Sequence, residues 1–554
     1  MVTLHETEVD GVRCFWVETG RPTLASLLVF RFGMLDENLN ESGWQHLLEH
    51  MALHDTEAGA LHTNGSVSLM ETVFEAHGPA DAVSAHLVAL STQLAQPRFD
   101  ELSRERDVLR AEADVRGSSA SGRAIGWRYG ATGPGVVAYS DPALGRATED
   151  ALAARAHRAF NRDNGVLMLD GPPPPGLRLH LPEGERVLPR PARPCEQPTP
   201  AAYQEEAGLV LSGVVSRTAS MSISGELLRQ AVADKFRHEA GTAYAPWVSY
   251  ERVDAEHAVL LAGTDVQAPG RPTLVADAIE IVHSLSERGP DPDKLAEVQA
   301  SQLQSLKDPY ATFGVAVRAG HDYLRRRPTL TLEQMAEEIE STDVATVQQG
   351  FRELRQTLLL GVPGDAPVGT RLPVLEFTRI PPPIGGRRFR HRNWPAVSEL
   401  LVMHPTQLEM RHETGSRVAV FQDLVGMFAF EDGRRHLVRS DGYGLTVDPS
   451  QWHRGQEAVA ELDRVVPASL HLPHPADNLS NRPPRLGWFA RWRPALTRNA
   501  VRGLVSKPAL FLVFLATWIA GFVAIVKFDI HGVGPVWAVL GGAAVFGVLR
   551  SDHG

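Results

Sequence analysis

Residues 43–52 read Gly-Trp-Gln-His-Leu-Leu-Glu-His-Met-Ala, and this stretch decides how the rest of the sequence is interpreted. Residues four positions apart on an α-helix lie on the same face. His46 and His50 can therefore both direct an imidazole nitrogen at one metal ion, and Glu49 projects near the same face. The spacing predicts a helix over Ser42–His54 that carries part of a metal site.

The start of this helix has a sequence signal of its own. Ser42, followed three residues later by Gln45, matches the capping-box pattern that precedes many helices. In that pattern the hydroxyl of the first residue accepts a hydrogen bond from the backbone of the fourth. The sequence therefore predicts that Ser42 caps the metal-binding helix.

A third metal ligand is expected from a second helix, predicted over Asp100–Arg116. Catalytic zinc sites usually combine three protein ligands with one open position. Glu105 and Glu112 are seven residues apart, so they lie on one face of that helix, and one could bind the ion while the other supports the site. The alternatives are a chance match to the histidine pattern and a solvated face of charged residues.

Three segments together resemble the insulinase/pitrilysin (M16) metallopeptidase family over roughly residues 1–375. They are FRFGMLDE (30–37), GWQHLLEHMA (43–52) and RERDVLRAEADVR (104–116). The resemblance implies that Zn2+ is bound by three residues: His46, His50 and Glu112. It further implies that Glu49 is the general base and that Glu105 is the supporting carboxylate.

Two further segments resemble the parts of this family that contact substrate. Asn64 and Gly65 match an edge strand that holds extended peptide by strand addition, although the family generally has Ala where Gly65 stands. FRHEAGTAY (236–244) places Arg237 and Tyr244 at positions that the resemblance assigns to substrate and transition-state contacts. The alternative is that Arg237 is a surface cation and Tyr244 a core residue.

The chain as a whole is expected to have an α+β fold with two repeated M16-type domains, each an antiparallel sheet flanked by helices. The endings of the two units are alike, since a helix pattern, a short strand and a Gly/Pro-rich stretch follow one another in both. The predicted divisions are a catalytic zinc domain (1–195), a substrate-chamber domain (196–385), a pleckstrin-homology-like β domain (386–475), a basic juxtamembrane linker (476–507) and a transmembrane hairpin (508–549).

Two boundary regions of this division have distinctive compositions. A Pro-rich stretch that ends near residue 195 is interpreted as an extended linker. A basic cluster precedes the β domain and consists of His391 and four arginines: Arg387, Arg388, Arg390 and Arg392. We interpret this cluster as a solvated linker in preference to a patch that binds lipid headgroups.

The C-terminal stretch predicts a membrane location. Residues 508–526 carry no charge and are long enough to cross a bilayer, and a second apolar stretch follows at 533–549, with a re-entrant segment as its alternative. Basic residues before the first stretch place the catalytic domains on the cytoplasmic side. The expected location is therefore the cell membrane, with two spans, and no secretory signal pattern is visible at the N-terminus.

The composition narrows the class of function. The net charge of -11 argues against a nucleic-acid partner, and the two cysteines, Cys14 and Cys195, indicate a reducing compartment. The expected protein is a membrane-anchored zinc endopeptidase that cleaves peptides or unfolded segments in a closed chamber. A catalytically silent M16-like membrane-bound binding or scaffold protein is the alternative. Because one chain holds both the zinc motif and the Arg/Tyr pair, a homodimer is favoured over a heterodimer.

Overall fold

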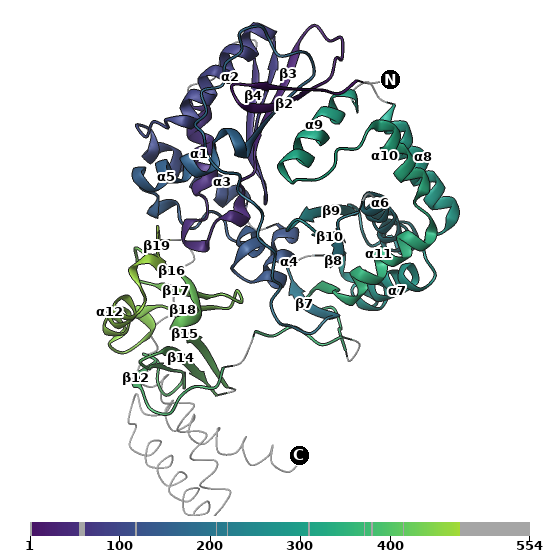
Figure 1. The fold of residues 1–554 in the computed structure, drawn as a ribbon. Coiled ribbons are helices and arrows are strands. Elements are labelled where there is room, and N and C mark those ends of the chain that lie inside the picture. The colour runs from purple at the N-terminus through teal and green to yellow at the C-terminus, as the bar shows by residue number, and fades with distance from the viewer. Residues whose placement is uncertain are drawn as a thin grey trace, which may run out of the picture.

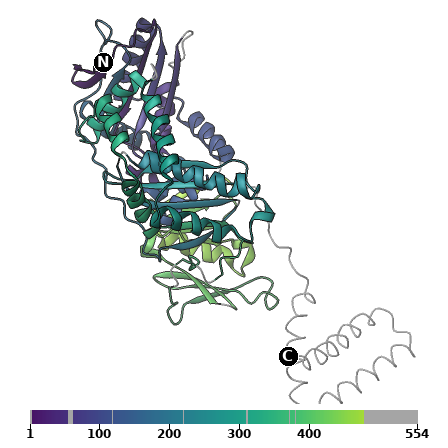
Figure 2. The ribbon, with the colours of Figure 1, turned by 90° about the vertical axis from the view of Figure 1, so that its right-hand side faces the viewer.

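The computed structural model describes residues 3–476, apart from 55–60, 117–118, 207, 219, 308–310, 370–371, 378–379 and 414. The described chain is a mixed α+β protein that contains four sheets (Figure 1). Its first two sheets belong to units of similar plan, and the other two form a smaller third unit. This third unit lies at the lower end of the molecule in both ribbon views (Figures 1 and 2).

The first unit contains a six-stranded sheet in the order β1-β2-β6-β3-β5-β4. Its strands are β1 (His5–Val9), β2 (Val12–Trp16), β3 (Leu24–Phe30), β4 (His62–Val67), β5 (Thr72–Gly78) and β6 (Gly165–Leu169). Its helices are α1 (Trp44–Leu53), α2 (Ala80–Ala95), α3 (Leu102–Arg116), α4 (Ala120–Tyr129) and α5 (Glu149–Ala159). All neighbouring strands are antiparallel except β2 and β6, which are parallel.

The second unit repeats this strand order. The strand order of its sheet is β7-β11-β8-β10-β9, which corresponds position by position to β2-β6-β3-β5-β4. Its parallel pair, β7 and β11, corresponds to the parallel pair β2 and β6 of the first sheet. The strands are β7 (Ala201–Glu205), β8 (Leu209–Ser216), β9 (Trp247–Arg252), β10 (His257–Thr264) and β11 (Leu359–Pro363). The helices are α6 (Ser220–Val232), α7 (Leu274–Glu287), α8 (Pro292–Leu306), α9 (Ala311–Leu324), α10 (Leu332–Ser341) and α11 (Val344–Gln356). The shared order supports an internal duplication.

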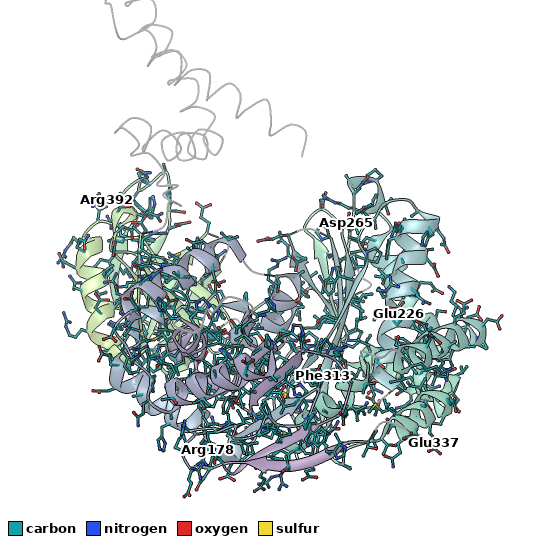
Figure 3. All side chains as sticks on the ribbon, turned by 90° about the horizontal axis from the view of Figure 1, so that it is seen from above. Arg178, Glu226, Asp265, Phe313, Glu337 and Arg392 are labelled. Atoms are coloured by element: carbon teal, nitrogen blue, oxygen red, sulfur yellow. The ribbon has the colours of Figure 1, made fainter. Side chains whose placement is uncertain are left out.

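Each of these two units supplies one helix to the sheet of the other. Alternate residues of a strand face opposite sides of a sheet, and in β3 Leu28 packs against the first unit's own helices whereas Val29 packs against α9. In return, Ile125 and Tyr129 of α4 pack on the second sheet. Phe313, labelled in Figure 3, belongs to the α9 cluster. Both sheets are therefore covered on both faces, which explains why β6 and β11 are apolar throughout.

The Pro-rich stretch is extended, as its composition predicts, but part of it packs into the core of the first unit. Residues 177–195 form no helix or strand, but Leu177, Leu179 and Leu181 are buried in the core of the first unit. The backbone carbonyl of Leu181 also accepts a hydrogen bond from Arg162. Burial of alternate leucines fixes this extended segment to the first unit, because their apolar side chains leave water.

The third unit consists of two four-stranded sheets and one helix. The strands are β12 (Arg387–Arg390), β13 (Leu400–Met403), β14 (Gln407–His412), β15 (Gly415–Val420), β16 (Leu424–Phe430), β17 (Arg435–Arg439), β18 (Gly444–Val447) and β19 (His471–His474), and the helix is α12 (Gly455–Val465). The basic cluster interpreted as a linker lies largely in β12, where Arg387 pairs with Glu457 and Glu461 of α12. The likeness to pleckstrin-homology domains stays a prediction.

The third unit is joined to the first by direct contacts. Arg146 donates hydrogen bonds to the backbone carbonyls of Ala468, Ser469 and His471. Leu472 of β19 is buried in the same core as helix α1. Asn40, which precedes α1, also donates a hydrogen bond to the carbonyl of Ser469 at 3.0 Å, so the third unit contacts the segment that leads into this helix.

The predicted cell-membrane location is contradicted and is corrected here. No helix among the described residues is both long and apolar enough to cross a membrane. The juxtamembrane linker (476–507, except its first residue) and the hairpin (508–549) on which the prediction was based lie outside the described residues.

Candidate metal centre

Helix α1 is held at its N-terminus by a carboxylate that lies outside the helix. Glu37 accepts hydrogen bonds from the backbone N–H groups of Gly43 (3.0 Å) and Gln45 (2.8 Å), and Arg155 donates to the same carboxylate at 2.8 Å. Burial outweighs these partners and raises the pKa of Glu37 to about 7. The predicted cap at Ser42 is therefore wrong: Gly43 is the N-cap residue, with a φ of 94°, and makes no side-chain cap.

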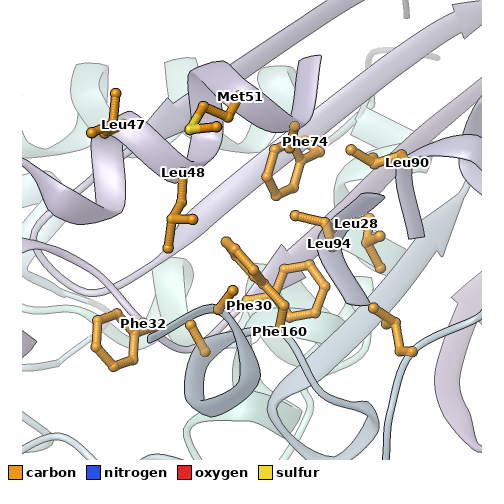
Figure 4. Close-up of a cluster of buried hydrophobic side chains, with 14 of the residues drawn as sticks. Leu28, Phe30, Phe32, Leu47, Leu48, Met51, Phe74, Leu90, Leu94 and Phe160 are labelled. Atoms are coloured by element: carbon orange, nitrogen blue, oxygen red, sulfur yellow. The ribbon is translucent and has the colours of Figure 1, made fainter. Parts of the chain in front are cut away.

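The opposite face of α1 anchors the helix in the core. Leu47, Leu48 and Met51 pack with Phe74 and Phe160, as Figure 4 shows. These apolar residues lie on one face of α1, and His46 and His50 lie on the other. Burial of the apolar face therefore directs both histidines away from the core. Packing therefore fixes the direction in which both imidazoles point.

The two histidines converge with Glu112 on one point. His46 Nε2 lies 4.0 Å from Glu112 Oε2, and His50 Nε2 lies 3.6 Å from Glu112 Oε1. Donor atoms of His46, Glu49 and His50 also lie within 4.8 Å of one another. Ligand atoms around a tetrahedral zinc ion, each about 2.1 Å from it, are roughly 3.4 Å apart. The donor types and their separations therefore fit a zinc ion.

Each histidine is oriented from behind by a carboxylate. His46 Nδ1 lies 2.9 Å from Asp141 Oδ2, and His50 Nδ1 lies 3.3 Å from Glu105 Oε2. A histidine that donates its Nδ1–H to a carboxylate presents the lone pair of Nε2 to a metal. Glu105 thus lies beside His50, and its supporting role stays a prediction. Asp141, beside His46, was not expected from the sequence.

Glu49 lies beside the point on which His46 and His50 converge, and it is largely buried. Its carboxylate is 4.0 Å from His46 Nε2 and 3.9 Å from His50 Nε2, with 5% of the side chain exposed. Burial raises the pKa of Glu49, which the two histidines partly oppose. A carboxyl group with a raised pKa next to a metal position is suited to accepting and returning a proton.

Strand β4 borders the centre and is the outermost strand of its sheet. It pairs with β5 on one side only, so its other edge is available for strand addition. Asn64 and Gly65 of β4 line the same pocket as the histidines. Gly65 is in close contact with Glu49, because a Cβ atom at this position would lie 1.8 Å from Glu49 Oε1.

The pocket around the centre has a volume of about 780 Å3 and is built from the first unit. Met34 and Arg104 also line it, and neither was expected from the sequence. Among the described residues, no member of the second unit contributes to the lining. The pocket therefore combines a metal position, a buried carboxylate and an open strand edge.

Arg237 and Tyr244 do not reach this pocket within one chain. Arg237 lies in a π-helix at Ala233–Glu239, which follows α6, and its guanidinium is 5.7 Å from the centre of the Tyr244 ring. Tyr244 is 76% exposed, and Asp265 accepts a hydrogen bond from its backbone N–H at 2.9 Å. The two residues form an exposed pair on the second unit, so the core position considered for Tyr244 is wrong.

Comparison with known proteins identifies the fold. No family model and no curated protein sequence matches the chain. A peptidase M16 inactive domain from Pseudomonas fluorescens matches with a TM-score of 0.56 and 16% identity, covering 66% of this chain and 98% of that one. A protease from Helicobacter pylori matches with a TM-score of 0.55 and 12% identity, covering 66% and 100%. Pitrilysin matches with a TM-score of 0.50 and 16% identity, covering 65% of this chain and 44% of its own.

The chain therefore has the fold of M16 peptidase domains. At these identities the likeness establishes the fold alone, and the matching structures include both proteases and an inactive domain. Whether the chain is active must therefore be argued from its own residues.

Proposed function

We propose that this protein is a zinc-dependent endopeptidase that acts on peptides or unfolded segments. The observation that carries the proposal is the convergence of His46, His50 and Glu112, with Glu49 buried beside them. His46, His50 and Glu112 would hold the ion. Zinc, when bound, would polarise the peptide carbonyl and lower the pKa of a water molecule.

The protein's own residues divide the remaining tasks. Glu49 would take a proton from the attacking water on a carboxylate oxygen and deliver it to the nitrogen of the leaving amine. Asp141 and Glu105 would keep the two imidazoles in the required tautomer and orientation through Nδ1. These roles need no side chain beyond those that line or support the pocket.

Substrate would bind as an added strand. The free edge of β4 offers backbone N–H and C=O groups to an extended peptide, and Asn64 adds a side-chain amide. Main-chain pairing depends little on sequence, so we expect broad peptide specificity. A folded protein cannot present an extended segment of this kind without local unfolding, which favours peptides and unfolded segments as substrates.

The catalytic arrangement would be completed by a second copy of the chain. Arg237 and Tyr244 are exposed and lie outside the metal pocket of their own chain, and both are donors suited to stabilising an oxyanion. In a homodimer, the second unit of one copy would face the metal pocket of the other and close the chamber. A heterodimer is the alternative arrangement.

A catalytically silent binding protein is the second candidate. It is favoured by the likeness to the inactive domain from Pseudomonas fluorescens. Metal analysis of the purified protein, combined with cleavage of an unstructured peptide, separates the two candidates. The peptidase predicts about one zinc per chain and cleavage that a chelator abolishes and added zinc restores, whereas the silent protein predicts no cleavage under any of these conditions.

A further inference from the structure

A second cavity, with a volume of about 450 Å3, lies between the start of α6, strand β9 and helix α9. It shares no lining residue with the metal pocket. Five of the residues that line it are arginines: Arg217, Arg252, Arg318, Arg325 and Arg327. Asp322 is the only carboxylate among the described residues that line it. The cavity is thus a concentration of positive charge in a chain whose net charge is -11.

The positive charge of this cluster is only partly neutralised by the protein. Within the part of the chain that the structure describes, no carboxylate forms an ion pair with Arg217, Arg252 or Arg327. Arg318 lies 3.7 Å from Asp322 and 3.9 Å from Glu338, and both distances are too long for a direct hydrogen bond. Most of the guanidinium groups therefore retain hydrogen-bonding capacity toward a bound anion.

Arg325 is the most enclosed member of the cluster. Its side chain is 6% exposed, and one of its terminal nitrogens lies 2.6 Å from Glu71. Its Nε, although buried, has no hydrogen-bond partner among the described residues. A buried donor without a partner raises the free energy of the folded state unless a ligand satisfies it. A ligand in the cavity that Arg325 lines would be one way to satisfy this donor.

Arg217 is held in place by backbone groups and not by charge. It donates hydrogen bonds to the carbonyls of Asp254 (2.8 Å) and Ala255 (3.1 Å). Burial and the neighbouring arginines together lower the pKa of its guanidinium to about 10. Backbone bonds of this kind fix the side chain at the cavity wall despite repulsion from its neighbours. The cluster is consequently pre-organised, which favours ligand binding.

We propose that this cavity binds an oligophosphate anion. A planar guanidinium group matches a pair of phosphoryl oxygens, and several such groups require a ligand with more than one negative charge. A single carboxylate would leave most of the arginines uncompensated. The hydroxyl-bearing residues Thr218, Ser222 and Tyr250 also line the cavity, and Thr218 is already paired with Ser220 at 2.9 Å. The arginines are therefore the groups on which anion binding would depend. The site does not depend on the proposed peptidase activity.

Calorimetric titration of the full-length protein with inorganic pyrophosphate tests the proposal. We expect saturable binding of one pyrophosphate per chain, weakened by added salt. The double variant Arg252→Gln/Arg327→Gln should lower the affinity about tenfold or more, since each charged hydrogen bond contributes on that scale. Both side chains are exposed and make no ion pair among the described residues, so the variant should fold.

The matched control is Arg464→Gln, an exposed arginine on α12 in the third unit. It should bind pyrophosphate as tightly as the unmodified protein does. Both variants keep His46, His50 and Glu112, so a selective loss in the double variant cannot come from the metal pocket. Equal binding by all three proteins, or no saturable binding, would overturn the proposal. Tighter binding of a tetra-aspartate peptide than of pyrophosphate would also overturn it, in favour of a peptide carboxylate site.

Discussion

Asp141 accepts a hydrogen bond from Nδ1 of His46, with 2.9 Å between the heavy atoms. The two residues are 95 positions apart, and the loop that carries Asp141 packs directly against the start of α1. Gly43 permits this approach, because a Cβ atom there would lie 2.7 Å from Cβ of Asp141. The proposed metal centre therefore depends on a loop that sequence spacing does not connect to it.

Replacement of Asp141 should weaken metal binding without removing a ligand. We expect Asp141→Ala to lower zinc affinity by about 10- to 100-fold, because the imidazole of His46 loses the group that orients it. Competition with a chromogenic chelator measures this change. The control Asp107→Ala removes an exposed carboxylate of α3 and should leave the affinity unchanged. Equal affinities for all three proteins would show that Asp141 does not position His46.

Gly65→Ala should separate metal binding from catalysis. The added Cβ would lie 1.8 Å from Glu49 Oε1, so the carboxylate must move, whereas the three proposed ligands are not displaced by it. Although the family that the sequence resembles generally has Ala here, the Glu49 carboxylate of this chain occupies the space of the added Cβ. We therefore expect peptide cleavage to fall by about tenfold or more with zinc content retained. Gly314→Ala, whose Cβ would meet no atom within 4 Å, is the matched control. Unchanged cleavage by Gly65→Ala would mean that Glu49 tolerates the shift or is not the base.

Glu71 should make stability depend on pH in the acid range. Burial alone would raise its pKa, but His321 and Arg325 outweigh burial and lower it to about 2, below the ordinary value of 4.5. A depressed pKa means that the folded state gains stability above pH 4.5 and loses it as the pH falls toward 2. Glu71→Gln should therefore lower the free energy of unfolding by about 3 kcal/mol at pH 7.

Urea unfolding at pH 7, 4.5 and 3 measures this effect. The difference between the unmodified protein and Glu71→Gln should shrink as the pH falls below 4.5. Glu75→Gln changes an exposed glutamate on β5, the strand that begins directly after Glu71, and should have little effect at any pH. A difference that stays constant with pH would contradict a charged, ion-paired Glu71.

Mixing two inactive variants tests the proposed exchange of residues between copies. Glu49→Gln removes the base of its own pocket, and Tyr244→Phe removes the donor that would serve the partner's pocket. If each active site combines both chains, random mixed dimers contain one intact site, and roughly a quarter of full activity returns. If no activity returns after subunit exchange has been verified, Glu49 of one chain and Tyr244 of the other do not form a shared active site.

The local elements were predictable because their signals are short-range. The helix predicted over Ser42–His54 is observed as Trp44–Leu53, and that predicted over Asp100–Arg116 as Leu102–Arg116. Helical spacing alone placed the two histidines on one face of the first helix, and Glu105 and Glu112 on one face of the second. The structure then brings these faces together. The residue roles assigned from the resemblance stay predictions until they are measured.

The remaining features depend on contacts between distant parts of the chain. Asp141 is a single acid in a loop, so no spacing could assign it to His46. The α1 N-terminus is capped by Glu37 and not by Ser42. Arg155 holds the buried Glu37 carboxylate where it can accept a hydrogen bond from the backbone N–H of Gly43. The exchange of α4 and α9 between the two sheets is likewise tertiary, since an apolar helix face does not specify which sheet covers it.

Peptide cleavage by Glu49→Gln protein that retains zinc tests the central proposal most directly. The substitution preserves the shape of the side chain but removes its ability to accept a proton at neutral pH. We expect about one zinc per chain and a loss of cleavage of about a hundredfold to ten-thousandfold, which is the contribution of a general base. Cleavage near the level of the unmodified protein, with zinc content also unchanged, would contradict the proposal.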